Sequence, residues 1–368
     1  MGPVRVCRYA GFSTLPRYYD ALFEAAEGRS LYLTRAWFEL LATHCLEGNE
    51  ELVFYGAEAE DGQGTALALL MAQSGASRGR FMRRRTLSSL ANWYSGLYAP
   101  IYTPVSAENA AAIDGICRAI RATVPRWSHV HLYPLDADSR EFSALCDSLR
   151  RHGYLVRRRF KFRNWFEPID GGDFAKYLQN RKSKTRGTIR RKDKRVRQRD
   201  DVRFEIFTTD RNIDRAVAAY QQVYDASWKE AEVYADFVPS LIRHCAKEGS
   251  LRLGILFIGN EPAAVEFCIL ASGVATMFKT AYDPRFRGLS VGTVVMMRVL
   301  EHVLDCETVR EIDFGMGDET YKTEFASASR ELHEIVAYDP RSWAGAVDGL
   351  YDVLRRVVRA RGRSGSKR

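Results

Sequence analysis

A turn of small residues near residue 290 joins a strand-like run to an apolar helical pattern. The strand-like run ends in "AYD", the helical pattern contains "VVMMRVL", and the residues of interest between them are Arg285, Arg287, Gly288, Leu289, Ser290, Val291, Gly292 and Thr293. Small residues let backbone amides approach phosphate oxygens, and a helix start carries a partial positive charge. These features indicate a pyrophosphate cradle, although a serine-capped turn between a strand and a helix would show the same pattern.

A second candidate stretch is "EIDFGMGDETYKTEF", residues 311–325. An apolar run ends near Asp313, two glycines follow, and Asp318 can cap a short helix that begins near Glu319. We expect Lys322 to point inward from that helix, where its ammonium group can bind a phosphate or stabilise an oxyanion. The alternative is a solvated lysine on a short surface helix.

Glu266 interrupts the apolar strand "PAAVEFCIL", so we expect its carboxylate to be at least partly buried. An amine that attacks a carbonyl must lose a proton, and Glu266 is a candidate for the general base that removes it. The same residue would also fit the exposed face of an edge strand. Further candidates for the base and for a general acid are Asp313, Asp318, Glu319, Tyr282 and Tyr321.

Two α/β units are predicted to position these residues. Residues 1–165 show helices and strands in alternation, with Thr34 placed to cap a helix and Gly153 placed to end another. Residues 166–345 repeat much of that order as helix, helix, strands, helix, strand and strand. The domain boundary is predicted near residue 165, and a basic helix and tail are predicted for residues 346–368.

Positive charge is concentrated in a few segments, although the whole chain carries a net charge of +9. Residues 181–199 contain eleven Lys and Arg against one acid, Asp193. We predict a basic helix over residues 174–199, held by a narrow apolar stripe of Leu178, Ile189 and Val196. Such a helix suits an acidic glycan, a phosphate-bearing acceptor, an acyl-carrier protein or tRNA, unless it is only a solvated face.

The length of 368 residues allows two domains, and 46% hydrophobic residues indicate a folded protein. No apolar run reaches the roughly 18 residues that a membrane span needs, and the N-terminus lacks the apolar core of a secretory signal. The expected location is the cytoplasm. Seven scattered cysteines without a CxxC pair suggest reduced thiols, and no metal site is expected.

The loop Arg287–Gly292, "RGLSVG", resembles the acetyl-CoA loop of the GNAT acyltransferase superfamily, whose pattern is Q/R-x-x-G-x-G/A. Ser290 stands where that pattern has its first glycine. Together with "DASW" at 225–228 and the G-x-E-x-Y-K pattern that ends at Lys322, region 175–340 resembles the CelD-like acetyltransferases. These are associated with cellulose and exopolysaccharide loci. The two-domain plan is similar to the Fem-type peptidoglycan aminoacyltransferases, which have twin GNAT units.

The resemblance implies an α/β fold of two GNAT-like domains with mixed sheets flanked by helices, the first of them degenerate. It also implies transfer of an acyl group, most simply acetyl, from acyl-CoA to an amine or hydroxyl acceptor by direct attack on the thioester, without a metal. The loop from Arg285 to Thr293 would hold the pyrophosphate, and Lys322 would offset phosphate or oxyanion charge. The acceptor, a small molecule, glycan or peptide, would meet Trp228, Asp318 and Glu319. Two alternatives stay open: an aminoacyl-tRNA-dependent transferase, and a non-catalytic module that docks nucleic acid or membrane.

Overall fold

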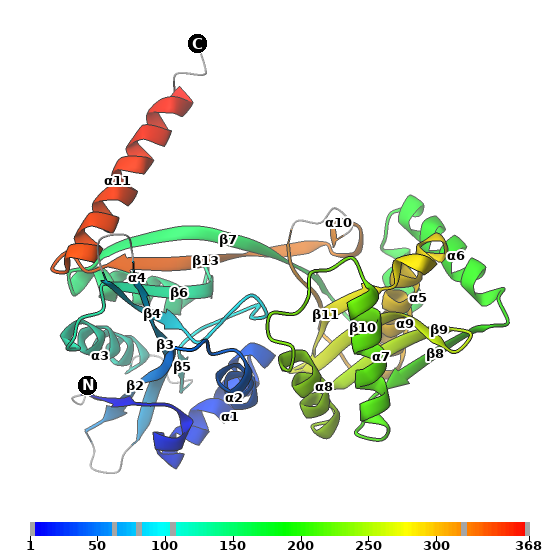
Figure 1. The fold of residues 1–368 in the computed structure, drawn as a ribbon, viewed down its shortest axis with the longest axis horizontal. Helices are drawn as coiled ribbons and strands as arrows, with labels where there is room; N and C mark the ends of the chain where they lie inside the picture. The colour runs from blue at the N-terminus through cyan, green and yellow to red at the C-terminus, as the bar shows by residue number, and fades with distance from the viewer. Residues whose placement is uncertain (1–3, 61–64, 79–82, 104–107, 318–321, 365–368) are drawn as a thin grey trace. The chain divides into compact units, whose positions relative to one another are not determined.

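The computed structural model describes residues 4–60, 65–78, 83–103, 108–317 and 322–364 (Figure 1). The chain divides into two compact units. Unit 1 comprises residues 1–162 and 331–368, and unit 2 comprises residues 163–330. The chain therefore enters unit 2 within strand β7 (Leu155–Pro168) and returns to unit 1 within strand β13 (Ala328–Tyr338).

The end of the predicted second domain, 166–345, differs from this division. Residues 332–338 of β13 pair antiparallel with β6 (His129–Asp136), so this part of the chain belongs to the sheet of unit 1. At the other boundary, unit 2 begins at Arg163.

Unit 1 combines a mixed sheet with five α-helices among its described residues. Its further strands are β1 (Val4–Tyr9), β2 (Glu51–Ala59), β3 (Ala66–Arg78), β4 (Arg83–Ser89) and the short β5 (Ile101–Tyr102), and its helices are α1 (Asp20–Glu27), α2 (Arg35–His44), α3 (Glu108–Ala122), α4 (Arg140–Arg151) and α11 (Trp343–Ser364). The strand order is β1-β2-β3-β4-β6-β13. Only β4 and β6 are parallel; the other neighbours along this order are antiparallel.

Local sequence signals explain helix ends in unit 1. Thr34 is the N-cap of α2, and its hydroxyl accepts a hydrogen bond from the backbone amide of Trp37 at 3.1 Å. Ser139 caps α4 in the same way, through the amide of Phe142. Gly153 follows α4 with a φ of +82°, a conformation that glycine adopts without steric cost.

The strands of unit 2 are neighbours in the order β7-β12-β11-β10-β9-β8. Its further strands are β8 (Val202–Phe207), β9 (Leu251–Ile258), β10 (Glu261–Ala271), β11 (Val274–Tyr282) and β12 (Glu311–Met316). Its helices are α5 (Phe174–Gln179), α6 (Ser183–Arg197), α7 (Ile213–Ala226), α8 (Phe237–Lys247), α9 (Val291–Cys306) and α10 (Lys322–Phe325), with a 3-10 helix, η4 (Pro284–Leu289), before α9. Neighbouring strands are antiparallel except β11 and β12, which are parallel.

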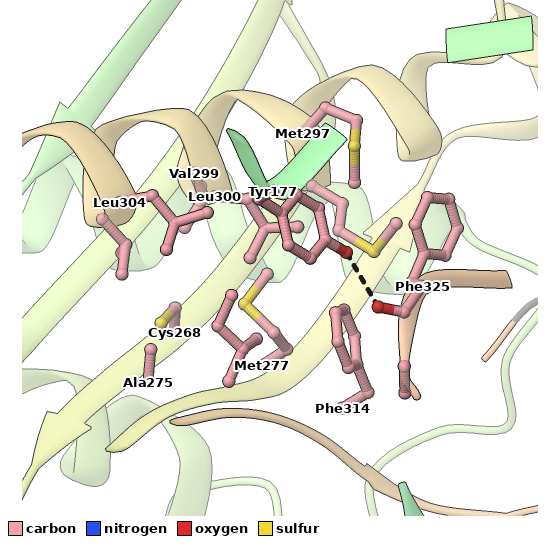
Figure 2. Close-up of a cluster of buried hydrophobic side chains, with 14 of the residues drawn as sticks. Tyr177, Cys268, Ala275, Met277, Met297, Val299, Leu300, Leu304, Phe314 and Phe325 are labelled. Atoms are coloured by element: carbon pink, nitrogen blue, oxygen red, sulfur yellow. Dashed lines mark hydrogen bonds between the residues drawn. The ribbon is translucent and has the colours of Figure 1, made fainter. Parts of the chain in front are cut away.

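Helix α9 packs on one face of this sheet, and α7 contacts the other (Figure 1). Figure 2 shows the cluster of buried side chains beneath α9, where Met297 and Leu300 meet Met277 of β11 and Phe314 of β12. Phe325 of α10 joins the same cluster. Burial of these apolar side chains fixes α9 and α10 against the ends of β11 and β12.

The prediction of one basic helix over residues 174–199 is wrong. The structure has two helices there, α5 and α6. The break comes at Arg181, whose guanidinium group is buried and pairs with the carboxylate of Glu167 on β7. The same guanidinium donates to the carbonyl oxygen of Phe325 at 2.8 Å. Because Arg181 turns inward to make these bonds, it is a structural cation and contributes nothing to the exposed charge of α6.

The mixed β-sheet flanked by helices confirms the predicted α/β fold class. Within the described ranges, no helix combines the length and the apolar character required to cross a membrane.

Candidate active site

Strands β11 and β12 are parallel neighbours that pair over a short distance. Their register joins Val274 to Glu311 and ends with Thr276 opposite Asp313, whereas β11 runs on to Tyr282 in pairing with β10. Beyond this point β12 turns at Gly315, which has a φ of +75°. The carboxyl ends of parallel strands that lead into a loop and a helix are the usual ligand-binding edge of an α/β sheet.

A β-bulge lies in the same part of β11. Phe267 of β10 pairs with Lys279, but the next residue, Cys268, pairs with Met277, so Phe278 is the extra residue. Bulges change the direction of a strand and are common beside active sites. The bulge places Thr280 and Tyr282 on the face of the sheet that α9 covers.

The turn between β11 and α9 has the backbone geometry of an anion cradle. Ser290 occupies the N-cap position of α9 with a φ of +56°, in the left-handed region, and its side chain makes no capping hydrogen bond. The carbonyl oxygen of Ser290 accepts from the amides of Thr293 and Val294. The amides of Val291 and Gly292 are the first of the helix and have no earlier turn to bond, so they are available to an anion by geometry.

The left-handed conformation of Ser290 explains why the GNAT pattern has a glycine at this position. The GNAT pattern has a glycine there, and glycine adopts positive φ without steric cost. Ser290 takes the same conformation in this chain. The structure therefore does not support the alternative of a serine-capped turn, because a side-chain cap requires an extended N-cap residue.

Gly292 is required by close packing. A Cβ atom at this position would lie 2.8 Å from Cδ1 of Tyr282, whereas a Cβ on Gly288 would meet open space. Tyr282 in turn packs on the exposed ring of Trp228, with 4.4 Å between ring centroids. The predicted residues Trp228 and Tyr282 thus lie together beside the start of α9.

The two predicted arginines of the loop have different surroundings. Arg285 pairs with Asp283 at 2.7 Å and with Glu261 at 2.9 Å, and its hydrogen bonds lower the pKa of the Asp283 carboxyl. Its charge is therefore largely compensated. Arg287 is exposed and makes no ion pair within the part of the chain that the structure describes, so its charge is available to a ligand.

Two cations from α6 reach the same loop, and sequence reasoning did not assign them to it. The ammonium group of Lys192 donates to the hydroxyl of Thr293 at 3.1 Å, and Arg195 donates to the carbonyl oxygen of Gly288 at 3.1 Å. Burial lowers the pKa of Lys192, and the negative charge of Glu324 partly offsets this shift. Lys192 therefore adds a partly buried positive charge to a helix start that is already positive.

The spacing of residues in α6 could have placed Lys192 on the packed face of the helix, but not against the loop. Thr185, Ile189 and Val196 are the buried residues of the helix. Lys192 falls between the last two at intervals of three and four, which places it on the face that packs toward α9. A lysine on a packed stripe beside a helix start suggests a specific role, unlike the exposed lysines on the opposite face.

Glu266 is completely buried, and its two oxygens differ in their contacts. Thr280, directly opposite on β11, donates its hydroxyl hydrogen to Oε2 at 2.5 Å. No hydrogen-bond partner for Oε1 is present among the described residues. Burial raises the pKa of Glu266 to about 7, although the Thr280 hydrogen bond and the charge of Lys229 oppose the shift. The alternative position on an exposed strand face is wrong for this residue.

Lys322, the first residue of α10, is buried at the end of β12. Its ammonium group donates to the carbonyl oxygen of Met316. Phe325, one turn later, fixes α10 in the core, and the hydroxyl of Tyr177 donates to the Phe325 carbonyl oxygen at 2.9 Å (Figure 2). Lys322 is therefore inward-pointing, and the alternative of a solvated surface lysine does not hold.

Asp313 has a local structural role. Its Oδ1 accepts hydrogen bonds from Asn164 Nδ2 at 2.6 Å and from the amide of Gly315 at 2.7 Å. These bonds hold the turn at the end of β12. The other predicted residues of this stretch, Asp318, Glu319 and Tyr321, lie outside the described residues.

A family comparison supports the chemistry that this arrangement suggests. Residues 183–323, from the start of α6 to α10, match the family described as an acetyltransferase (GNAT) domain. Unit 2 carries a GNAT-type acetyltransferase domain. The match includes the loop before α9, Glu266 and Lys322. Asn164, Tyr177 and Phe325 lie outside the matched residues. No protein among the curated sequences matches the chain.

Solved structures share the fold over most of the chain. FemX superposes with a TM-score of 0.56 at 9% identity, covering 89% of this chain and 96% of FemX. A conserved protein of unknown function from Bacteroides thetaiotaomicron gives a TM-score of 0.54 at 10% identity, with 87% and 95% coverage. A tandem GNAT protein from the clavulanic acid biosynthesis pathway gives 0.47 at 11% identity, with 90% and 98% coverage. At these identities the first two show a common fold.

Unit 1 also contains one pair of parallel neighbouring strands among its described residues. Its parallel strands β4 and β6 also pair at few positions, from Thr86 with His129 to Ser88 with His131. Immediately afterwards the hydroxyl of Ser89 donates to the carbonyl oxygen of Tyr133, and the buried Tyr98 donates its amide to the carbonyl oxygen of Pro134. The end of β4 and the neighbouring part of β6 are therefore held by hydrogen bonds within unit 1.

Proposed function

We propose that the GNAT domain transfers an acyl group, most simply acetyl, from acyl-CoA to an amine or hydroxyl acceptor by direct attack on the thioester. The observation that carries this proposal is the start of α9, where the left-handed Ser290 leaves two helix amides without a side-chain cap and Lys192 lies against Thr293. Amides and cations together are the groups that bind a pyrophosphate. A CelD-like acetyltransferase is our specific interpretation within this class.

The residues of the loop fit the acyl-CoA co-substrate. Val291 and Gly292 supply amides, and Arg287, Lys192 and Arg195 supply positive charge within one short region. Without an anion, these like charges and the helix start repel one another. A bound pyrophosphate would remove this repulsion, which is a physical reason for the cations to converge there.

Glu266 and Thr280 form the proposed route for the proton of the acceptor. Glu266 is inaccessible, but Thr280 is half-buried and connects it to the surface of the sheet. As the acceptor nitrogen or oxygen attacks the thioester carbon, its proton passes to Thr280 and the Thr280 hydroxyl proton passes to Glu266. A base with a pKa near 7 accepts this proton at neutral pH and releases it again after each turnover.

Lys322 and Tyr282 are assigned to the negative charges that develop during the reaction. The buried ammonium group of Lys322 would offset the charge on the thioester oxygen in the tetrahedral intermediate. When the carbon–sulfur bond breaks, the CoA thiolate leaves, and Tyr282 at the end of β11 would give it a proton. Trp228 would contact the acceptor, because its exposed ring lies on Tyr282.

Isothermal titration of the full chain with acetyl-CoA and with CoA tests the donor. We expect one site per chain with a Kd on the order of 1–100 µM, in the range common for enzyme substrates. Absence of binding at millimolar ligand would contradict an acyl-CoA donor. A Lys322→Ala variant that binds acetyl-CoA normally and keeps full kcat would exclude the oxyanion role while leaving the donor assignment intact.

A second candidate function is an aminoacyl-tRNA-dependent transferase. The observation that favours it is the outer face of α6, where Lys184, Arg190 and Lys194 are exposed and form no ion pair among the described residues. These cations are separate from Lys192 at the loop. Salt-sensitive binding of tRNA together with no heat from acetyl-CoA would support this candidate, and an acyl-carrier protein as donor would be tested in the same titration.

A further inference from the structure

Helix α11 packs against the rest of unit 1 through one face, and this face carries two glycines. A Cβ atom on Gly345 would lie 2.3 Å from the carbonyl oxygen of Asp339 and 2.7 Å from that of Ser128, so only glycine fits there. A Cβ on Gly349, one turn later, would lie 3.0 Å from Cδ1 of Leu155. The backbone of α11 therefore packs directly on unit 1, and this contact fixes which face of the helix points away.

The acidic residues of α11 also face unit 1. Asp348 accepts hydrogen bonds from Arg84 at 2.7 and 2.9 Å and pairs with His129 at 2.9 Å. Asp352, one turn later, pairs with Arg157 at 2.8 Å and with Arg159 at 2.6 Å. These two are the only acids in the sequence of α11, so the opposite face carries no negative charge.

The opposite face is an apolar stripe that remains exposed. Its large side chains are Trp343 (81% exposed), Val347 (42%), Leu350 (59%), Tyr351 (63%) and Leu354 (54%). Their spacing of four, three, one and three residues places them on one side of a helix. In the sequence, Val358 continues this spacing. The stripe is about 17 Å long, since each helical residue rises about 1.5 Å.

Positive charge follows the stripe directly. Residues 355–368 contain seven Lys and Arg and no acid. An apolar face of large side chains followed by a run of cations is the composition of a helix that lies in the interface of an anionic bilayer. At about 17 Å the stripe is far shorter than the roughly 30 Å of a hydrocarbon core, so it can lie along a membrane surface but cannot cross it.

We propose that α11 docks the protein on an anionic membrane surface, with the stripe Trp343–Leu354 in the headgroup region. The seven cations that follow in the sequence give the preference for anionic lipid. Charge complementarity favours this partner over a second copy of the chain, because a second copy would bring seven more cations to the same place. It also favours lipid over nucleic acid, because nucleic acid gives no partner to an apolar stripe. This proposal is independent of the acyltransferase assignment.

Cosedimentation with vesicles tests the proposal on the full chain. Vesicles of equimolar phosphatidylcholine and phosphatidylglycerol are compared with vesicles of phosphatidylcholine alone. Each lysine or arginine near an anionic surface strengthens binding about fivefold, so we expect the anionic vesicles to bind at least about tenfold more tightly and high salt to reverse the difference. Triple substitution Arg355→Gln, Arg356→Gln and Arg359→Gln should remove most of this preference.

A double variant of the apolar stripe, with a matched control, tests whether the stripe contributes to vesicle binding. Leu350→Glu with Leu354→Glu should reduce binding to anionic vesicles at least about tenfold, because it places two carboxylates in the headgroup region. Both leucines are exposed, so acetyl-CoA binding and thermal stability should not change. The control, Val233→Glu, changes an exposed apolar residue of unit 2 and should bind vesicles like the wild type.

Three results would overturn the proposal. The first is that the full chain does not sediment with the anionic vesicles, whether or not it binds RNA. The second is equal vesicle binding by the wild type and the Leu350→Glu, Leu354→Glu variant. The third is a dimer in light scattering that this variant converts to a monomer, since the stripe would then bind a second copy.

Discussion

Thr280 Oγ1 donates to Glu266 Oε2 at 2.5 Å, and the two residues occupy directly opposed positions on β11 and β10. Because the strand pairing fixes both Cα positions, the contact does not depend on a flexible loop. It connects a completely buried carboxylate to a half-buried hydroxyl. The pair therefore offers a defined path for one proton between the surface of the sheet and its interior.

Substitution of this pair should lower the rate of acyl transfer without weakening substrate binding. Glu266→Gln keeps the size of the side chain but removes the base, so we expect kcat to fall on the order of 10²-fold. Thr280→Val should reduce kcat similarly, whereas Thr280→Ser should retain most of it. Steady-state kinetics with acetyl-CoA measure these effects. Full activity in Glu266→Gln would show that the acceptor loses its proton elsewhere.

The stability of the protein should depend on pH through Glu266. Burial raises its pKa from 4.5 to about 7 in the native state, so between these values the native state holds a proton that the unfolded state has lost. The free energy of unfolding contributed by this group therefore falls as pH rises from about 4.5 to about 7, by a total on the order of 3 kcal/mol.

Urea denaturation at several pH values measures this dependence. Glu266→Gln stays uncharged, so its stability relative to the wild type should increase as pH rises. The exposed Glu248→Gln serves as a control and should follow the wild-type curve. Parallel curves for the wild type and Glu266→Gln would show that the carboxylate ionises in the native state as it does in water.

Ser290 should be a position where glycine stabilises the protein. A non-glycine residue in the left-handed region costs about 1–2 kcal/mol, and glycine loses about 0.5–1 kcal/mol of this gain through unfolded-state entropy. Ser290→Gly should therefore increase the free energy of unfolding by roughly 0.5 kcal/mol, and Ser290→Val should decrease it by about 1 kcal/mol or more. Equal stabilities of the two variants in urea would argue against the left-handed backbone.

The two glycines of the loop should respond differently to alanine. In Gly292→Ala the new Cβ would lie 2.8 Å from Tyr282, so the ring or the start of α9 must move. We expect the Kd of acetyl-CoA to rise about tenfold, the loss of roughly one hydrogen bond to a charged group. Gly288→Ala is the matched control, because nothing lies within 4 Å of its Cβ. If both variants bind alike, the packing of Tyr282 on Gly292 has no role in donor binding.

Lys192 should contribute to donor binding, unlike the exposed lysines of α6. Lys192→Gln can retain a hydrogen bond to Thr293 but removes the charge, so we expect the Kd of acetyl-CoA to rise about tenfold. Lys184→Gln removes a charge from the exposed face of the same helix and should change the Kd less than about twofold. Titration calorimetry on both variants decides whether the Kd of acetyl-CoA depends on the position of the lysine on the helix or only on the total charge.

Much of the fold could be predicted from hydrophobic periodicity, and strand β7 shows where this failed. Its segment "RRRFKFR" contains five basic residues, so it resembles a solvent-exposed basic run more than a strand. Phe160 and Phe162 alternate with Arg159, Lys161 and Arg163, which is the period of a strand. Because most of these residues are charged, the segment lacks the apolar run by which a strand is usually recognised. Arg159 and Lys161 form ion pairs with carboxylates of unit 1, so their charge is used inside the fold.

The parts of the candidate site that depend on short sequence patterns could be predicted. The parts that depend on contacts between distant segments could not. The turn before α9 and the burial of Glu266 follow from short patterns in the sequence. The contact of Lys192 with Thr293 joins residues about a hundred positions apart, and only tertiary packing produces it. Arg285 was predicted to bind the pyrophosphate. Its charge is compensated by Glu261, a residue far from it in sequence, and the sequence did not reveal this partner.

The return of the chain within β13 limits how the protein can be cut. A fragment of residues 166–345, the boundaries that the sequence suggested, would carry Glu331–Tyr338 without its partner β6. An unpaired strand edge of this kind promotes aggregation. Expression of unit 2 alone therefore requires termini near residues 163 and 330. A C-terminal end well beyond residue 330 would take strand β13 away from unit 1.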